Sequence, residues 1–533
     1  MTKLVESVCC ALYPPHRRAD FSRTLYIVAC GCLSIGFSGI ATAMSHLAAH
    51  PSTENFSRAF SRRLSELERI EPVPLADLFS LVNGDEPVLG ELRNVLHASL
   101  LDRTIAHARQ HTIFYASDPA YAEWTPRTDG RPSPLDGLPI VDRPLMASRL
   151  RDFLADDVHL RSICHTSGTT GLPLDVYKSF EEIAFINAFY TRLFEPFARL
   201  LTSRPLVLSF PNVHHGVPVP MPGIGLTFVG GVTEDGLIED AIRILDTRYD
   251  IEGHDHKISI VSGLDHHLML FTAALLDRGI EPRRFELNAI NITGGFISTH
   301  WLRFLEDTWN CVVNDRFTLT EVIGGASRLR GSDVFVLDPH LVGEVLDYDS
   351  RRPVDGGVGL LALTNLHPFV QLQPTIRYLT GDLVRRISCD GPLRFQFLGK
   401  SKNCISRLRN GTREWLLFSA HLNDLLHQFG DIRTFDRYSN LVSICDRSLG
   451  SHPVVQVTSQ EIGNTMLVRI AIELRYSPHG RPLRVAEMKS QILRALENTP
   501  DTVFAGGRKP EDVDLDVVFC GPGATNAPIV VKI

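Results

Sequence analysis

The sequence has few lysines, no C-x-x-C pair of cysteines and a small net charge for its length. Eight of its 54 basic residues are lysine, so a lysine beside a motif is more informative than an arginine. The ten cysteines are spread over 533 residues with no C-x-x-C pair, which excludes a disulfide scaffold. The formal charge of −7 argues against a protein that coats nucleic acid or an anionic membrane. We expect reduced thiols and a cytoplasmic protein with no nucleic-acid partner.

The first 55 residues form a predicted N-terminal extension with one ambiguous segment. Residues 25–45 carry no charge for 21 residues, which is long enough for a membrane span. Three glycines and three serines dilute the hydrophobicity of that segment. We expect a buried or disordered extension, or a start codon assigned too early with Met44 as the initiator. A membrane anchor at residues 25–45 is the alternative, and membrane contact is expected only in that case.

The remaining chain has the patterning of a folded α/β protein. Apolar residues make up 44% and charged residues 22% of the sequence, close to the globular average. A helical pattern covers residues 56–109, a turn-rich loop is expected over 119–139, and helices then alternate with strands, which predicts a parallel or mixed sheet covered on both faces. Residues 342–398 read as a β-rich portion. We predict a large domain over 56–398 and a small, mobile α+β domain over 399–533.

A glycine-rich string after a predicted strand is the most specific motif. Residues 165–173 read HTSGTTGLP. Two glycines among hydroxyl side chains let the backbone form a concave nest of N–H groups, to which the hydroxyls add further donors. The Walker A pattern is absent. The string predicts a polyphosphate site.

TSGTTGLP resembles the phosphate loop of the adenylate-forming superfamily of acyl-CoA synthetases, nonribosomal-peptide adenylation domains and luciferases. The segment before it, residues 100–146, further resembles the phenylacetate-CoA ligase branch. Other motifs follow in the order of that family, and the resemblance covers the chain from about Leu89 onward. They are VLSFPNVHHG at 207–216, TGGF at 293–296, DRFTLTE at 315–321, IRYLTGDL at 376–383 and LGKSK at 398–402.

The resemblance implies ATP, Mg²⁺ and coenzyme A as ligands, and it assigns roles to individual residues. Thr320 would contact the α-phosphate, Glu321 would ligate Mg²⁺, and Asp382 would accept hydrogen bonds from the ribose hydroxyls. A C-terminal lysine would act in adenylation; Lys532 is favoured and Lys509 is the alternative. The residues expected to bind the nucleotide are Thr166, Ser167, Gly168, Thr169, Thr170, Gly171, Gly294, Gly295, Phe296, Phe317, Asp382 and Lys400.

The same resemblance places the acyl pocket near His214, His215 and Gly216. The residues around it, 210–229 and 295–298, are largely aliphatic and aromatic, which favours an apolar or aryl carboxylic acid. The oligomeric state is not predicted.

Several positions depart from the family pattern. Phe317 replaces a tyrosine, Thr318 a glycine and Lys400 an arginine, while Leu172 and Leu174 stand where relatives often carry lysine. We predict an AMP-forming ligase that activates a carboxylic acid as its adenylate and transfers the acyl group to coenzyme A. The alternatives are transfer to a carrier-protein thiol or an amine, and a degenerate protein that binds nucleotide or acyl ligand without turnover.

Overall fold

The computed structural model describes most of the chain after residue 86. The described residues are 87–126, 134–166, 174–180, 182–183, 185–186, 201–210, 225–294, 297–387, 392–435, 452–508 and 510–524. The predicted extension, with its uncharged segment 25–45, lies outside them. In the described part, no helix combines the length and the apolar character that crossing a bilayer requires.

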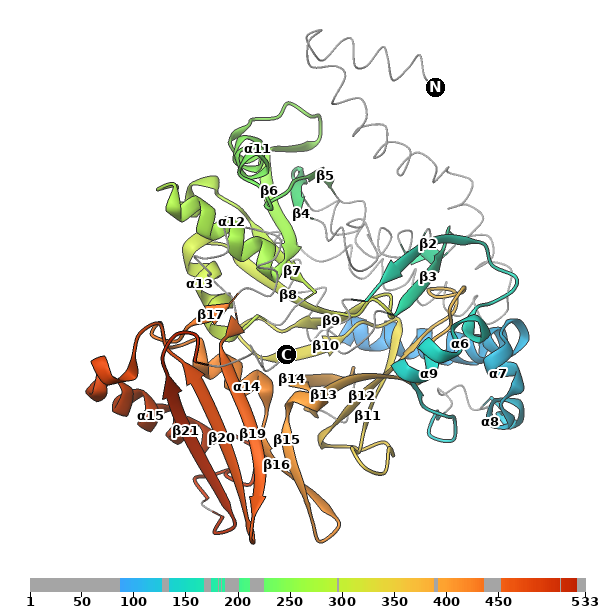
Figure 1. Ribbon diagram of the computed structural model, residues 1–533. Helices are drawn as coiled ribbons and strands as arrows, with labels where there is room; N and C mark the ends of the chain where they lie inside the picture. The colour runs from blue at the N-terminus through green and yellow to red at the C-terminus, as the bar shows by residue number, and fades with distance from the viewer. Residues whose placement is uncertain are drawn as a thin grey trace.

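A mixed 12-stranded sheet forms the centre of the large domain (Figure 1). Its path runs β11-β12-β13-β14-β10-β9-β8-β7-β6-β4-β5, and β1 pairs with β13 off this path. The strands from β4 to β8 are mutually parallel, whereas those from β8 through β14 to β11 pair antiparallel. The bounds are β1 Val141–Asp142, β4 Arg204–Phe210, β5 Leu226–Val229, β6 His254–Leu264, β7 Ala289–Thr293, β8 Val312–Thr318, β9 Gly325–Arg328, β10 Val334–Leu337, β11 Leu341–Leu346, β12 Gly357–Asn365, β13 Tyr378–Arg386 and β14 Arg394–Lys400.

Helices cover the inner parallel strands, which are largely buried. The interior of β7 is buried along its length, as expected for a parallel strand between two layers. Helices α11 (Asp235–Asp246), α12 (Asp265–Asp277) and α13 (Thr299–Trp309) follow β5, β6 and β7 in turn, and their apolar faces share one core with those strands. The predicted α/β architecture, including these three helices, is confirmed.

The N-terminal part of the described chain packs beside this sheet. It contains α6 (Pro87–His111), α7 (Ile113–Ser117), α8 (Pro119–Glu123), α9 (Arg143–Ser148) and η2 (Leu150–Phe153), followed by the hairpin β2 (Leu160–His165) and β3 (Asp175–Ser179). The expected loop over 119–139 was wrong at its start. Asp118 caps a short helix there by accepting a hydrogen bond from the Ala120 amide, and Pro119 lies in its first turn, where proline needs no partner for its nitrogen.

A separate small domain follows Lys400. It comprises η4 (Ser401–Asn403), the hairpin β15 (Ile405–Arg409) and β16 (Thr412–Leu417), α14 (Ser419–Leu426), β17 (Thr434–Phe435), β18 (His452–Pro453), η6 (Pro478–Gly480), α15 (Pro482–Leu496) and a three-stranded sheet of β19 (Val455–Ile462), β20 (Thr465–Glu473) and β21 (Val513–Cys520). It has its own hydrophobic core and lies to one side of the large sheet (Figure 1). The large sheet ends at Lys400, and the domain boundary at residues 398/399 stays a prediction.

Gly399 allows the chain to pass from one domain to the other. Its φ is +123°, and a Cβ built there would lie 1.9 Å from Ser419 Oγ, the first residue of α14. Both the backbone conformation and the close approach require glycine at this position.

We expect Gly399→Ala to destabilise the protein by about 2–4 kcal/mol, because it adds an overpacked contact to a positive-φ strain. Gly411→Ala is the matched control: Gly411 has a φ of +77° with nothing within 4 Å of its Cβ position, so it carries the strain alone. Thermal unfolding should rank Gly399→Ala below Gly411→Ala, and Ser419→Gly should partly restore the former. Equal midpoints for the two alanine variants would contradict this account.

Candidate active site

Several of the residues predicted to bind the nucleotide follow strands that end at one edge of the parallel part of the sheet. In register, Leu264 of β6 pairs with Thr293 of β7, which pairs with Arg316 of β8. The three strands therefore end at the same edge, where sheets of this kind bind ligands. Gly294 turns the chain there with a φ of +84°, and residues 319–321 follow β8 at the same edge.

Glu321 is held by a tyrosine from a distant part of the chain. Its carboxylate is 7% exposed, and Tyr378 Oη donates a 2.8 Å hydrogen bond to its Oε1. Burial and the neighbouring Glu321 charge both raise the pKa of Tyr378, so its hydroxyl stays protonated and remains the donor. This bond connects the segment after β8 to the first residue of β13.

Hydrogen bonds to Thr166 hold the two residues that flank the glycine-rich loop. Thr166, directly after β2, is 5% exposed. Its Oγ1 accepts hydrogen bonds from the Leu174 amide at 2.9 Å and from the Arg143 guanidinium. Arg143 starts α9 immediately after β1, and β1 pairs in parallel with β13 through Val141 and Tyr378. The two ends of the loop are thus tied to the strand that carries Tyr378.

Asp382 lies on that same strand and is fully buried. Lys400 Nζ is 2.6 Å from its Oδ1, as the register pairing of the two residues across β13 and β14 requires. The second oxygen, Oδ2, is buried without a hydrogen-bond partner among the described residues. A buried carboxylate with an unsatisfied oxygen is costly unless a ligand or water completes it, which fits a group that accepts hydrogen bonds from a ligand.

Tyr378 is the point at which these features converge. It bonds Glu321 and pairs with Val141 next to the Arg143–Thr166 contact. The Asp382 carboxylate is near enough to raise the pKa of Tyr378 and Arg143 near enough to lower it, although burial is the largest effect. The structure therefore brings Thr166, Glu321 and Asp382 into one region.

Two further predicted residues lie in the described chain. Phe317 packs its ring against the rings of Phe335, Phe395 and Phe397, at centroid distances of 6.4, 5.7 and 6.1 Å. That packing holds one side of the ring, and its stacking on adenine stays a prediction. Thr320 is half-buried beside Glu321 in the turn after β8.

The remaining predicted residues lie outside the described residues, and their roles stay predictions. They are Ser167, Gly168, Thr169, Thr170 and Gly171 of the loop, Gly295 and Phe296 of the adenine turn, His214, His215 and Gly216 of the acyl pocket, and the two lysines Lys509 and Lys532.

Lys178 is a candidate site residue that the sequence motifs did not identify. It lies on β3, just after the glycine-rich loop, and is fully buried, while its Nζ has no hydrogen-bond partner among the described residues. Burial lowers its pKa, and the charges of Glu182, Cys164 and Glu321 oppose that shift. Glu182 already accepts three backbone N–H bonds. The scarcity of lysine was the signal that could have identified Lys178.

A network of hydrogen bonds around Arg328 holds residues 297–299, which follow the TGGF motif. Its guanidinium donates to Ile297 O at 3.2 Å, to Thr299 Oγ1 at 2.8 Å and to Asp315 Oδ2 at 3.4 Å. Burial raises the pKa of Asp315 to about 7, and Arg328 opposes that rise. The network thereby joins Ile297 and Thr299, which follow the TGGF motif, to Asp315 of β8.

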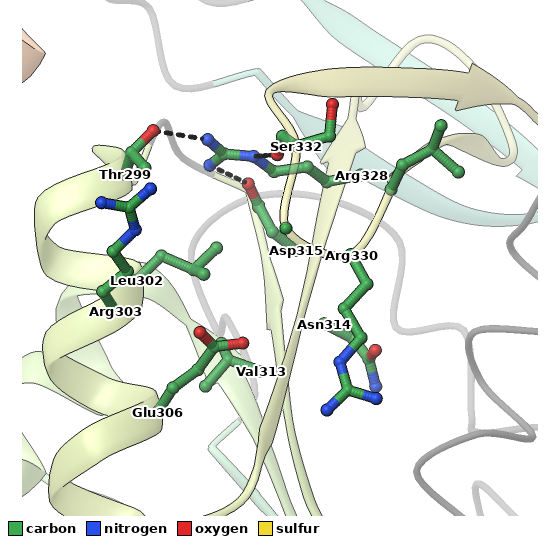
Figure 2. Close-up of a pocket in the computed structure, with 12 residues that line it drawn as sticks. Thr299, Leu302, Arg303, Glu306, Val313, Asn314, Asp315, Arg328, Arg330 and Ser332 are labelled. Atoms are coloured by element: carbon green, nitrogen blue, oxygen red, sulfur yellow. Dashed lines mark hydrogen bonds and ion pairs between the residues drawn. The ribbon is translucent and has the colours of Figure 1, made fainter.

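A pocket lies beside this network, between α13 and the β9–β10 turn (Figure 2). Among the described residues, those that line it include no predicted nucleotide residue, so it is separate from the site above. They are Thr299, Leu302, Arg303, Glu306, Val313, Asn314, Asp315, Arg328, Leu329, Arg330, Gly331 and Ser332.

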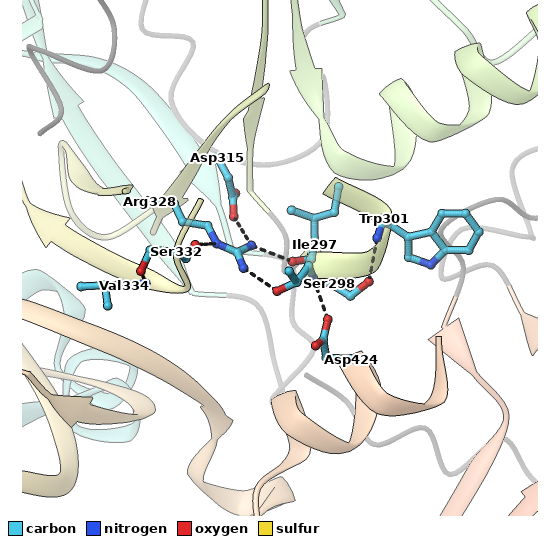
Figure 3. A network of polar contacts seen from close by, with 9 residues as sticks. Ile297, Ser298, Trp301, Asp315, Arg328, Ser332, Val334 and Asp424 are labelled. Atoms are coloured by element: carbon cyan, nitrogen blue, oxygen red, sulfur yellow. Dashed lines mark hydrogen bonds and ion pairs between the residues drawn. The ribbon is translucent and has the colours of Figure 1, made fainter. Parts of the chain in front are cut away.

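Two side chains of the small domain, Asp424 and His427, contact the start of α13. Asp424 of α14 accepts a 2.6 Å hydrogen bond from the Thr299 amide, and Figure 3 shows Asp424 reaching from its helix toward the network at Ser298. Thr299 is the first residue of α13, where backbone N–H groups lack intrahelical partners. The Trp301 and His427 rings meet edge to face nearby, at 5.8 Å between centroids. Asp424 therefore binds the first turn of a helix of the other domain, as one of several contacts between the domains that include the ion pairs Arg385–Asp501 and Arg413–Asp349.

We expect Asp424→Ala to weaken this docking by about 1 kcal/mol, the usual value of a helix cap. Amide hydrogen exchange at residues 299–302 should accelerate about fivefold. Glu487→Ala is the control, since Glu487 lies on the exposed face of α15 and bonds only within that helix. Unchanged exchange in Asp424→Ala would contradict the proposed docking contact.

No family model matches the chain, and no curated protein matches it in sequence. Its structure is similar to solved structures of 2-hydroxyisobutyryl-CoA ligase. The open conformation of that enzyme, in complex with 2-HIB-AMP and CoA, has a TM-score of 0.55 at 15% identity, over 81% of this chain and 89% of that chain. The postadenylation state of the same enzyme, in complex with R3-HIB-AMP, has a TM-score of 0.55 at 15% identity, over 81% of this chain and 87% of that chain. The chain has the fold of the adenylate-forming enzymes, as the resemblance implied.

Proposed function

We propose that this protein activates a carboxylic acid with ATP and Mg²⁺ to an acyl-adenylate and transfers the acyl group to coenzyme A. The observation that carries the proposal is the convergence at Tyr378 of the glycine-rich loop ends, a buried glutamate and a buried aspartate. The structurally similar 2-hydroxyisobutyryl-CoA ligase was solved with an acyl-adenylate and CoA, which supports the same reaction class here.

The chemistry explains why anionic phosphates need such a site. The acid's carboxylate oxygen attacks the α-phosphorus of ATP, and the bond from that phosphorus to pyrophosphate breaks. A thiolate then attacks the acyl carbon and AMP leaves. The first step concentrates negative charge on the phosphates, so catalysis depends on positioning and on opposing charge.

Glu321 fits a magnesium ligand by its chemistry. Mg²⁺ prefers carboxylate and phosphate oxygens, and Tyr378 occupies only one of the two oxygens of Glu321. The ion would neutralise charge on the phosphates. Tyr378 is a positioning residue: its hydroxyl fixes the orientation of the Glu321 carboxylate, and its strand pairing sets the distance to Thr166 and Asp382.

Asp382 fits a ribose ligand because it offers two acceptor oxygens to two hydroxyl donors. Lys400 now takes one of them, so ribose binding would displace the lysine or share the carboxylate with it. Lys400 ends β14 at the junction with the small domain. We infer that nucleotide binding and small-domain orientation are coupled through this ion pair, in line with domain movements that gate many enzymes.

The proposal also covers the type of acid, the catalytic lysine and the acyl pocket. We favour an apolar or aryl acid, a phenylacetate-CoA ligase-like enzyme, and Lys532 as the catalytic lysine, with His214, His215 and Gly216 at the acyl pocket. Transfer to a carrier-protein thiol or an amine is the first alternative. A degenerate binding protein is the second, favoured by Phe317 and Lys400. The cytoplasmic location stays a prediction.

Pyrophosphate exchange into ATP, driven by a panel of aryl and alkyl acids, tests the proposal. At least one acid should support exchange, and CoA should then yield a thioester. Exchange without a thioester would favour another acceptor. ATP binding without exchange on any acid would overturn the enzymatic assignment in favour of the degenerate protein.

Substitutions at the two carboxylates should affect the assay differently. We expect Glu321→Gln to lower exchange by about 10²-fold or more, because it removes charge beside the phosphates. Asp382→Asn should mainly raise the KM for ATP, by about 10- to 100-fold, since a charge-assisted hydrogen bond contributes roughly 1.5–3 kcal/mol. Glu487→Gln on the exposed face of α15 is the control. Wild-type kinetics in both site variants would contradict the assignment.

Lys178→Met separates a functional lysine from a structural one. Replacing a buried, unpartnered ammonium with an apolar chain of similar length should raise the thermal midpoint. If Lys178 opposes phosphate charge, exchange should at the same time fall by about 10²-fold.

Lys257→Met is the matched control, because Lys257 is 40% exposed and pairs with Glu286 at the surface. It should leave both the midpoint and exchange near wild type. A Lys178→Met protein that is stabilised and fully active would show that Lys178 does not act on the phosphates.

A further inference from the structure

A cluster of histidines and aspartates lies outside the nucleotide site, at the C-terminal end of α6. His107 and His111 are four residues apart on this helix and therefore share a face. Asp156 and Asp157 come from the segment between η2 and β2. One ligand atom each of His107, His111 and Asp157 lies within 4.8 Å of the others. The sequence did not reveal this cluster, because Asp157 is remote from the two histidines along the chain.

The hydrogen bonds of the two imidazoles determine which nitrogens carry lone pairs. His107 Nε2 is 2.9 Å from Gln371 O, and His111 Nδ1 is 3.1 Å from Asp156 Oδ1. Carbonyl and carboxylate oxygens only accept, so each of these nitrogens carries the proton. His107 Nδ1 and His111 Nε2 are left as lone-pair donors. Metal-bound histidines have this arrangement, with the other ring N–H held by a carbonyl or a carboxylate.

One contact in the cluster leaves room for a cation between its two atoms. His111 Nε2 lies 3.4 Å from Asp157 Oδ2. If Nδ1 holds the proton of a neutral ring, these are two facing lone pairs, which repel unless a proton or a metal ion lies between them. Two ligands on a tetrahedral Zn²⁺ at about 2.0–2.1 Å are themselves about 3.4 Å apart. The observed separation therefore matches a shared metal.

A third histidine and several charges surround the cluster. The ring of His367 lies 4.4 Å from that of His107 between centroids, tilted by 38°, and its buried Nδ1 has no hydrogen-bond partner among the described residues. Arg103 is the opposing charge near His107 and His367, and Asp156 and Asp157 supply two negative charges against it.

We propose that His107, His111 and Asp157 form a binding site for a divalent transition metal of the Zn²⁺ class, with water in the remaining position. Two imidazole nitrogens and one carboxylate suit Zn²⁺ or Co²⁺ better than Mg²⁺ or Ca²⁺, which prefer oxygen ligands. The ion would join α6 to the segment that leads into β2. That segment is already held there, since the Asp156 amide donates to His111 O at 3.0 Å. The site is independent of the proposed reaction.

The test is metal binding by the full chain without affinity histidines. After treatment with EDTA and dialysis, the protein should take up one Zn²⁺ per chain by elemental analysis, and Zn²⁺ should raise its thermal midpoint. Co²⁺ should give the intense visible bands of a tetrahedral nitrogen-containing site. These measurements use no ATP, so they do not depend on the ligase activity.

Asp157→Ala and His107→Ala should each weaken Zn²⁺ binding by tenfold or more. Asp157 is 41% exposed, so its variant should fold even if the buried histidine variant does not. The matched control is the double variant His254→Ala/His256→Ala, which removes two closely spaced histidines of β6 that bond only backbone carbonyls. Failure of the wild type to hold Zn²⁺ or Co²⁺, or undiminished binding by Asp157→Ala, would overturn the proposal in favour of a protonated His111–Asp157 ion pair.

Discussion

The hydrogen bond from Tyr378 to Glu321 is the interaction on which the site depends. It joins the segment that leaves the parallel half of the sheet to a strand of the antiparallel half. Both partners are buried, and a buried carboxylate that lost its donor would carry an unpaid desolvation cost of about 1–3 kcal/mol or more. The sheet thus places the magnesium candidate opposite the strand that carries the ribose candidate.

The same strand organises the rest of the site. Its pairing with β1 positions Arg143 against Thr166, where the glycine-rich motif begins, and its pairing with β14 brings Lys400 onto Asp382. Lys400 is also the last residue before the small domain, and Asp424 of that domain caps α13. Lys400 and Asp424 therefore each link the candidate site region to the small domain, beside the ion pairs Arg385–Asp501 and Arg413–Asp349 and the apolar packing that also join the two domains.

Local patterns predicted much of this structure. Helices α11 to α15 and strands β6 to β8 lie where the periodicity indicated, because each buries one face or both. The motif order also predicted Glu321 and Asp382 as site residues, and the structure places both as buried carboxylates near Tyr378. What the sequence could not show depends on pairing between remote segments: the Tyr378–Glu321 bond, the Asp382–Lys400 ion pair, and the approach of Asp157 to His111. The helix at Pro119–Glu123 was missed because proline was interpreted only as a loop residue, although Asp118 is a capping residue.

The most direct measurement is a crystal structure of the protein with Mg²⁺ and a non-hydrolysable acyl-adenylate analogue. The account predicts both ribose hydroxyls on the Asp382 carboxylate, Lys400 withdrawn from at least one of its oxygens, and Mg²⁺ on the oxygen of Glu321 that Tyr378 leaves open. Adenosine bound elsewhere, for example in the pocket beside Arg328, with the Asp382–Lys400 pair intact, would contradict it.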